Sequence, residues 1–197
     1  MKLILASGSP RRKHILQNMG ISFSVVPADV EEVSGAIFPP RVPFINAIKK
    51  AVTVAEQYPD ALVLGADTII EFNEHIIGKP DSTEHAYRIL KMFSGHTHYA
   101  VTAVCFMCLS RKIKNIFCEE TAVTFHELDD SVIRSYLDKV KVLDKAGAYA
   151  IQEHGDMLIK HIDGSLENVI GLPGQRVLDA IHACGFDSFM LKQAPSL

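Results

Sequence analysis

Several features that would identify a function at once are missing from this sequence. Its 197 residues carry a net charge of −3, so no basic field attracts nucleic acid or an anionic membrane surface. No apolar run approaches the ~20 residues of a membrane-spanning helix, and the first residues lack the plan of a secretory signal peptide. We therefore expect a soluble, cytoplasmic protein with no nucleic-acid or membrane partner.

Cysteine is also scarce, and its four residues do not form a metal-binding pattern. Cys105 and Cys108 share a Cys-x-x-Cys spacing, but they lie in the apolar run 99–109, which predicts a strand that points them to opposite faces. No second Cys-x-x-Cys completes a zinc site, so buried, reduced structural thiols are the better interpretation. Among the nine scattered histidines, the closest pair, His96 and His98, is interpreted as a polar entry to this strand.

What is present is an ordinary globular composition, 48% hydrophobic and 22% charged. The length suits a single domain over residues 1–197 and allows two lobes around a central cleft. Strand-like and helix-like segments mix along the chain, with some strands adjacent and others separated by helices. This order predicts an α/β fold with a twisted, mixed β-sheet flanked by helices.

The hydrophobic pattern gives the expected order of elements. The predicted strands are 3–6, 23–26, 61–64, 99–109, 115–125, 157–162 and 189–191, with a hairpin over 69–77. The predicted helices are 11–19, 44–58, 82–92, 129–140 and 172–184. In the helix 44–58, the residues at helical spacing are Ile45, Ile48, Val52 and Ala55.

A strand, a turn of small residues and a helix start follow one another at residues 3–12. Ser9 is a good N-cap and Pro10 a good first-turn residue. A helix N-terminus favours an anion, and Arg11 and Arg12 add planar donors suited to phosphate. The segment predicts a phosphate site, with a solvated arginine pair as the alternative. It is neither a Walker loop nor a dinucleotide fingerprint, because it lacks both glycine patterns.

Acidic residues lie where they could meet this site. Asp67 follows the predicted strand 61–64, and ligands of open α/β folds bind beyond the carboxyl ends of strands. If the strands 3–6 and 61–64 are parallel neighbours, Asp67 and the arginines share one crevice. A carboxylate beside a polyphosphate then needs a divalent cation between them. Glu31 and Glu32 are a second acidic source for that ion, with a solvated loop as the alternative.

Two lysines complete the charge balance. Lys50 lies at the polar side of the helix 44–58, and Lys79 lies between Gly78, which clears space, and Pro80, which stiffens the segment. Either lysine alone could be solvated surface. Together the cations and acids suit phosphoryl chemistry, in which catalysis is positioning, charge neutralisation and metal activation of water. The residues thus predict an enzyme acting on a phosphate ester or anhydride.

Several segments in their joint order resemble the Maf family of nucleotide pyrophosphatases, which is structurally akin to the inosine triphosphate pyrophosphatases. The matching segments are 5–12, 31–32, 49–51, 65–68, 78–80, 90–102, 144–152 and 168–173. Any one is a weak signal, but their order along nearly the whole chain is specific. The resemblance implies a Maf-like fold and hydrolysis of a nucleoside triphosphate between its α- and β-phosphates, giving monophosphate and pyrophosphate.

The resemblance also implies roles for individual residues. Asp67 would accept the proton of the attacking water or hold the metal that activates it, and Glu32 would help to bind Mg²⁺ or Mn²⁺. The residues that would hold the triphosphate are Ser7, Arg11, Arg12, Lys50 and Lys79. Which of Glu31 and Glu32 touches the metal stays open, and a homodimer is consistent with the resemblance.

The base preference is predicted from three positions. Arg12, Thr68 and Gln152 resemble the branch that acts on dTTP and UTP, and modified pyrimidine nucleotides fit the same expectation. The side-chain amide of Gln152 can both donate and accept, which suits the neighbouring O4 and N3–H of a pyrimidine. The alternatives are a 7-methyl-GTP pyrophosphatase, against which Thr68 and Gln152 argue, and a nucleotide-binding regulator of septum formation that does not turn its ligand over.

Overall fold

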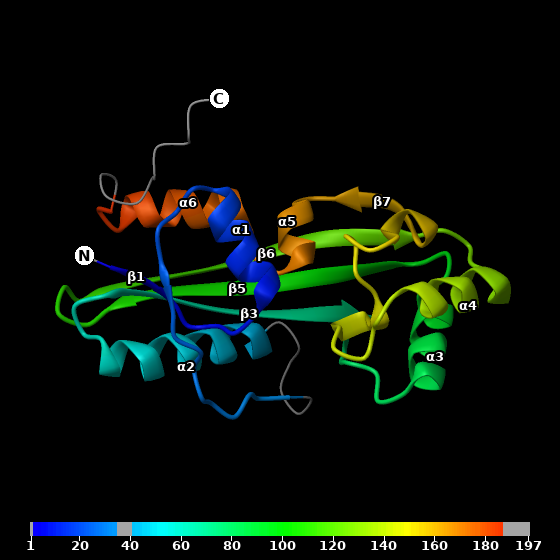
Figure 1. Ribbon diagram of the computed structural model, residues 1–197, viewed down its shortest axis with the longest axis horizontal. Coiled ribbons are helices and arrows are strands. Elements are labelled where there is room, and N and C mark those ends of the chain that lie inside the picture. The colour runs from blue at the N-terminus through cyan, green and yellow to red at the C-terminus, as the bar shows by residue number, and fades with distance from the viewer. Residues whose placement is uncertain (1, 35–40, 187–197) are drawn as a thin grey trace. The chain divides into compact units, whose positions relative to one another are not determined.

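The computed structural model describes residues 2–34 and 41–186, in which strands and helices mix along the chain (Figure 1). The strands are β1 (Leu3–Leu5), β2 (Ser24–Val25), β3 (Leu62–Phe72), β4 (His75–Ile77), β5 (Thr97–Cys108), β6 (Ile113–Phe125) and β7 (Ile159–Asp163). The α-helices are α1 (Pro10–Asn18), α2 (Val42–Gln57), α3 (Thr83–Phe93), α4 (Asp130–Lys139), α5 (Leu166–Ile170) and α6 (Gly174–Ala183). Two short 3₁₀ turns, η2 (Ala146–Ala148) and η3 (Gly155–Met157), precede β7.

The described strands form one mixed sheet in the order β2-β1-β3-β5-β6-β7, with β4 paired to β3. Strand β1 runs parallel to both β2 and β3, whereas β4 is antiparallel to β3 and β7 to β6. The α/β fold with a mixed sheet flanked by helices is thereby confirmed. The strands predicted at 3–6 and 61–64 are parallel neighbours, as the shared site requires, because Leu5 of β1 pairs in parallel with Leu64 of β3.

Strand β3 is longer than predicted. The expected end at Leu64 is wrong, because Gly65 and Ala66 continue in extended conformation and the strand runs to Phe72. Its first part pairs with β1 and its last part with β4, where Ile70 lies opposite Ile77. Asp67 therefore lies inside a strand rather than beyond its end, although β1 has already ended beside it.

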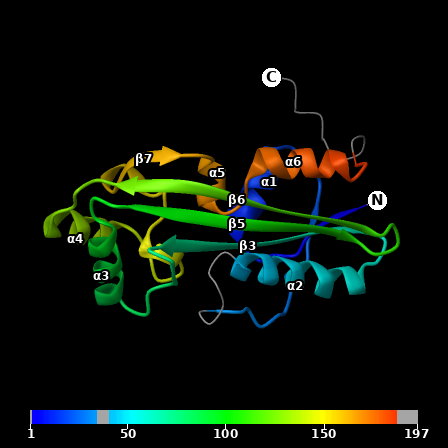
Figure 2. The ribbon, with the colours of Figure 1, turned by 180° about the vertical axis from the view of Figure 1, so that it is seen from behind.

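The described residues divide into two compact units, and β3, β5 and β6 each contribute to both. The first unit comprises 1–68, 102–119 and 171–197 within the described ranges. In it, α2 covers one face of the sheet and α1 and α6 cover the other (Figures 1 and 2). Its core packs small α2 residues, among them Ala47 and Ala51, against strand residues such as Ile4 and Val63. The predicted single domain with two lobes around a cleft stays a prediction.

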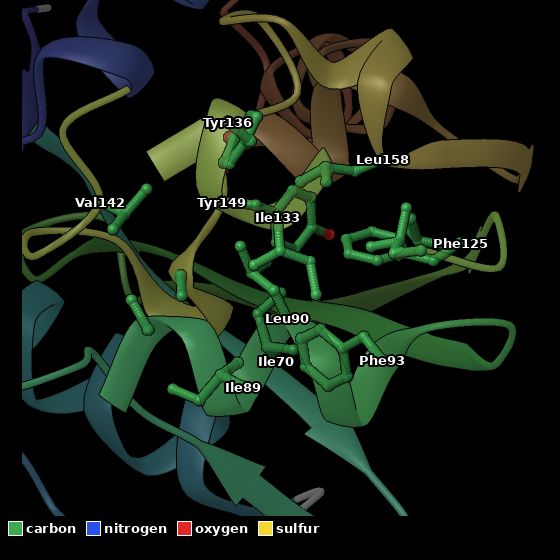
Figure 3. Packing of buried hydrophobic residues seen from close by; sticks show 14 of the residues in the cluster. Ile70, Ile89, Leu90, Phe93, Phe125, Ile133, Tyr136, Val142, Tyr149 and Leu158 are labelled. Carbon is green, nitrogen blue, oxygen red and sulfur yellow. The ribbon is translucent and has the colours of Figure 1, made fainter. Parts of the chain in front are cut away.

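The second unit comprises 69–101 and 120–170. Its core is larger and richer in aromatic residues, and it gathers side chains from β3, α3, β6 and α4 and from the segment 142–158 (Figure 3). Phe93, Phe125 and Tyr149 are among its buried rings. His98 lies in the same core at 0% exposure and stacks on Phe93 with ring centroids 4.2 Å apart. His98 lies at the start of β5, as expected, but it is buried among aromatic rings rather than exposed.

Other predictions have mixed outcomes. Cys105 and Cys108 are buried reduced thiols, as expected. The apolar face expected for α2 is rotated, because Ile45 and Ile48 are only half-buried while the small residues beside them are buried. The predicted strand 189–191 lies outside the described residues. Across the part of the chain that is described, every helix is too short or too polar to span a membrane.

Candidate functional site

The N-terminus of α1 has the cap and the first-turn proline that the sequence predicts. Ser9 caps the helix, with its Oγ accepting a hydrogen bond from the backbone N–H of Arg12 at 3.5 Å, and Pro10 occupies the first turn. The preceding turn is closed by the N–H of Ser9, which donates to Oγ of Ser7 at 3.3 Å. This local structure turns Arg12 inward, where it is only 8% exposed.

The guanidinium of Arg12 is held by neutral oxygens. Its Nε donates to the carbonyl of Gly171 at 2.9 Å, its Nη1 to Oγ of Ser7 at 3.1 Å, and its Nη2 to Oγ1 of Thr68 at 3.0 Å. The Thr68 hydroxyl is itself fixed by the hydroxyl of Thr102 at 2.9 Å and the carbonyl of Gly171 at 3.3 Å. Three predicted residues, Ser7, Arg12 and Thr68, thus form one hydrogen-bonded cluster.

This cluster keeps donors for an anion. A guanidinium has five N–H groups, and the partners among the described residues use three of them, one on each nitrogen of Arg12. One N–H remains on each terminal nitrogen, and a guanidinium with a donor on both nitrogens can bind phosphate in a bidentate manner. Ser7 accepts both of its contacts, so its own O–H can donate as well.

Burial lowers the pKa of Arg12 from its ordinary value, because a buried cation loses its hydration. The negative charges of Asp67 and Glu32 oppose that shift, and the adjacent Arg11 adds to it. An arginine still remains protonated under these conditions. An anionic ligand would stabilise this partly desolvated cation, whereas the nearby carboxylates would repel the anion unless a cation lay between them. Arg11 itself is partly exposed on α1.

A second cluster surrounds Lys50 of α2. Its Nζ lies 2.7 Å from Oδ1 of Asp67 and 2.6 Å from Oε1 of Glu32, with the carbonyl of Ala66 at 3.5 Å. Lys50 and Asp67 are 8% and 7% exposed, whereas the Glu32 side chain is 56% exposed. The predicted residues Glu32, Lys50 and Asp67 are therefore in contact, with the ammonium between the two carboxylates.

One member of this cluster, Asn46, was not predicted from the sequence. Asn46 is 2% exposed, and its Nδ2 donates to Oδ2 of Asp67 at 3.0 Å. It precedes Lys50 by four residues, one helical turn, so both side chains lie on the same face of α2. The position of an amide one helical turn before a candidate lysine was the available signal. The larger apolar residues of the helix, which predict a different buried face, obscured it.

The two clusters use alternate positions of one strand. Neighbouring residues of a strand point to opposite faces, so Asp67 turns to α2 while Thr68 turns to Arg12 of α1. The helices lie on the corresponding faces of the sheet (Figure 1). Strand β1 ends at Leu5, and the turn that follows it places Ser7 against Arg12.

A divalent metal fits these donors only together with a substrate. Among the described residues, no three side chains of His, Cys, Asp or Glu form a metal-binding group. Glu32 and Asp67 do present oxygens within 2.7 Å of one nitrogen, that of Lys50. Carboxylate oxygens are the ligands that Mg²⁺ prefers, and it commonly takes one or two of them plus phosphate oxygens and water.

Lys79 and Gln152, the other predicted residues, belong to the second unit. Both are exposed. Their segments are tied together, since the N–H of Gly147 donates to the carbonyl of Gly78 at 3.1 Å. Their assignment to the substrate stays a prediction.

Two side chains, Tyr136 and Lys145, anchor the loop that carries Gln152. The hydroxyl of Tyr136 accepts from the N–H of Ala150 at 2.9 Å and lies 3.4 Å from the carbonyl of the same residue. Lys145, which is 8% exposed, pairs with Asp144 at 3.0 Å and with Glu153 at 3.6 Å. This anchoring gives an exposed amide a defined backbone.

The architecture defines an α/β protein with an arginine cluster and a lysine–carboxylate cluster on one strand. Its fold is similar to that of a solved structure titled "The structure of the Staphylococcus aureus Ham1 protein". The similarity covers 94% of this chain and all of that one, with a TM-score of 0.51 at 16% identity. At this identity the likeness shows the fold alone.

The family model described as Maf-like protein matches residues 2–184. A protein of Akkermansia muciniphila named dTTP/UTP pyrophosphatase is 42% identical over 93% of this chain and 97% of its own length. A Bacillus cereus protein of the same name is 40% identical over 94% of this chain and 91% of its own. The chain therefore belongs to the Maf family, which confirms the resemblance drawn from its motifs.

Proposed function

We propose that this protein hydrolyses dTTP and UTP, and modified pyrimidine nucleotides of the same shape, to the monophosphate and pyrophosphate. The observation that carries the proposal is the contact of Asp67 with Lys50 and, through it, with Glu32, beside an arginine that retains donors for phosphate. The names of relatives at 40–42% identity over nearly the whole chain support the substrate class. In this proposal the enzyme acts in the cytoplasm on the nucleotide pool.

In this mechanism Arg12 and Ser7 hold the polyphosphate. The guanidinium is already oriented by three hydrogen bonds, so little side-chain entropy is lost when it binds the anion. The N-terminus of α1 adds the positive end of its dipole. Lys50 supplies a further buried positive charge. Arg11 completes the proposed phosphate-binding cations of the first unit, and a phosphate-binding role of Lys79 in the second unit stays a prediction.

Asp67 is the proposed proton acceptor. Its Oδ1 accepts from Lys50 and its Oδ2 from Asn46, and each carboxylate oxygen has a second acceptor position. A water molecule that donates to one of these positions is oriented for attack. As its oxygen bonds to phosphorus, the bridging P–O bond between the α- and β-phosphates breaks, pyrophosphate leaves, and the water proton passes to Asp67.

Mg²⁺ or Mn²⁺, held by Glu32 and Asp67 with the phosphate oxygens, would supply charge neutralisation and a more acidic water. Glu32 rather than Glu31 is the proposed ligand. The carboxylate of Glu32 lies against Lys50 at 2.6 Å, whereas the contact of Glu31 is made by its backbone carbonyl, which accepts from Lys49 at 3.2 Å.

The test is pyrophosphate release from dTTP, UTP, CTP, 7-methyl-GTP, GTP and ATP with Mg²⁺ or Mn²⁺. We expect dTTP and UTP to be turned over best, and Asp67→Asn to lower kcat by about 10²–10⁴-fold, the usual contribution of a general base. Asp60→Asn is a matched control, since Asp60 is an exposed carboxylate of the same unit.

Two other outcomes would point to a different function. Preference for 7-methyl-GTP would retain the chemistry and overturn the interpretation of Thr68 and Gln152. Tight nucleotide binding without turnover, with the same affinity in Asp67→Asn, would overturn the proposed hydrolysis. It would favour a nucleotide-binding regulator that does not turn its ligand over.

A further inference from the structure

All polar groups of the Asn46 side chain are used inside the candidate site. Its Oδ1 accepts from the backbone N–H of Val33 at 2.8 Å, and its Nδ2 donates both to the carbonyl of Val33 at 3.2 Å and to Oδ2 of Asp67 at 3.0 Å. At 2% exposure it is shielded from water. One amide therefore joins a loop, helix α2 and strand β3.

The chemistry of the partners permits only one orientation of this amide. The Asp67 carboxylate accepts hydrogen bonds and the N–H of Val33 donates one, so the NH₂ group must face Asp67 and the oxygen must face the N–H. Reversal would place oxygen against carboxylate oxygen and NH₂ against N–H. Leucine, of similar size, would satisfy neither partner, and glutamine is longer by one methylene. The position requires an asparagine-like amide.

Asn46 restrains the loop beside Glu32. Glu32 immediately precedes Val33, and its side chain is 56% exposed. The ion pair with Lys50 engages the end of this side chain, whereas Asn46 engages the loop backbone. The two hydrogen bonds between Asn46 and the backbone of Val33 are partly buried at the helix and fix the residue next to Glu32.

We propose that Asn46 is a positioning residue that sets Glu32 beside Asp67 and fixes which acceptor positions of Asp67 remain open. The inference rests on the proposed function, because it takes Asp67 and Glu32 as the groups that act on water and metal. Asn46 touches neither substrate nor reacting atoms. It acts through the carboxylate on one side and through the loop backbone on the other.

The first experiment separates positioning from binding of the nucleotide. In Asn46→Leu we expect kcat for UTP to fall about 10–100-fold and the Mg²⁺ concentration for half-maximal activity to rise by a similar factor, as is usual when the partner of a metal ligand is lost. The KM for UTP should change less than about threefold, because Arg12 and Ser7 are untouched. Asn46→Ser, which is smaller, serves if the leucine variant does not fold.

The control variant alters the same loop from outside the site. Lys49→Met removes the exposed hydrogen bond from Lys49 to the carbonyl of Glu31 and should leave kcat and the Mg²⁺ dependence within about twofold of the parent. A double-mutant cycle with Glu32→Gln then tests the route. If Asn46 acts in part through Glu32, its loss should lower kcat less once Glu32 has been replaced, and the remaining loss reports its contact with Asp67. Fully additive losses, or an unchanged kcat in Asn46→Leu, would overturn the proposal.

A readout that needs no turnover keeps the inference separate from the proposed function. Amide hydrogen exchange at Val33 and binding of Mn²⁺ alone, followed by electron paramagnetic resonance, are measured on the folded proteins. Faster exchange at Val33 together with weaker Mn²⁺ binding in Asn46→Leu supports positioning even if the parent hydrolyses no nucleotide. Unchanged exchange and unchanged Mn²⁺ binding would refute it.

Discussion

A β-carbon placed on Gly65 would lie 2.4 Å from the carbonyl oxygen of Ala47 and within 2.9 Å of Ala51. Real β-carbons do not approach other atoms this closely, so strand β3 and helix α2 are in contact only because this position is a glycine. The small residues Ala47 and Ala51 complete the close approach. The neighbouring helix residues Asn46 and Lys50 are thereby brought within hydrogen-bond distance of Asp67.

Gly65→Ala should therefore damage both stability and site. The new methyl meets backbone atoms, which cannot rotate away, and overpacking of a core typically costs about 1–3 kcal/mol. We expect a lower free energy of unfolding in urea and a lower kcat, since α2 must shift from Asp67. Gly78→Ala is the control for stability, because a β-carbon added at Gly78 would meet nothing within 4 Å. Equal stability of the two variants would show that α2 yields without strain.

Arg12→Lys tests the arginine cluster at constant charge. A lysine ammonium cannot replace the planar group that contacts Ser7, Thr68 and Gly171 together. We expect KM for the nucleotide to rise at least tenfold, about 1.4 kcal/mol, with a further loss in kcat if orientation of the phosphate suffers. Lys13→Gln removes a charge from an exposed position of the same helix and should change KM less. A larger effect of Lys13→Gln would indicate that net charge matters more than geometry.

The sequence was sufficient for most of the order of elements because the local signals agreed with the fold, although the short helix α5 was not predicted. Ser9 and Pro10 start α1 as predicted, and the hairpin turns at Asn73 and Glu74, both with positive φ. The end of β3 was misplaced because the small residues after Leu64 signal a turn locally, whereas pairing with β4 keeps the strand extended beyond them. Pairing between the strands therefore outweighed the local preference of these small residues for a turn.

The candidate site was likewise predicted only in part from the sequence. Charged residues in a familiar order pointed to Arg12, Lys50 and Asp67, which the fold places in the arginine cluster and the lysine–carboxylate cluster. Asn46 was missed because its role depends on a hydrogen bond to Val33, thirteen residues earlier, and on the rotation of α2. The close approach at Gly65 sets that rotation. Because Gly65 lies far from α2 in the sequence, the hydrophobic periodicity of the helix does not reveal it.

Tyr136→Phe should loosen the loop that carries Gln152. The substitution leaves the partly buried N–H of Ala150 without this partner, and the cost should fall towards the lower end of the about 1–3 kcal/mol typical of an unsatisfied buried group. Two residues further on, the Gln152 amide would be less well fixed. We expect the preference for UTP over CTP, measured as the ratio of kcat/KM values, to fall by more than the kcat for UTP. A preserved preference would indicate that Gln152 does not select the base.

Stability should depend on pH through His98. Burial lowers the pKa of His98 to about 3, while its Nε2 lies 2.9 Å from the Tyr149 hydroxyl. The unfolded chain takes up a proton near pH 6.5, and the folded chain does so only near pH 3. The contribution of neutral His98 is thus fully present above pH 6.5 and is lost as the pH falls from 6.5 towards 3, by up to about 1.4 kcal/mol per pH unit.

Urea unfolding at pH 7.5, 6.5, 5.5 and 4.5 measures this dependence, and His98→Phe isolates it. Phenylalanine keeps a ring against Phe93 but cannot bind a proton, and it leaves the Tyr149 hydroxyl without the partner seen in the parent. The variant should be less stable than the parent at pH 7.5, and its free energy of unfolding should fall less steeply below pH 6.5. The two curves should therefore converge as the solution becomes more acidic. Parallel curves would mean that other histidines, not His98, carry the acid sensitivity of this fold.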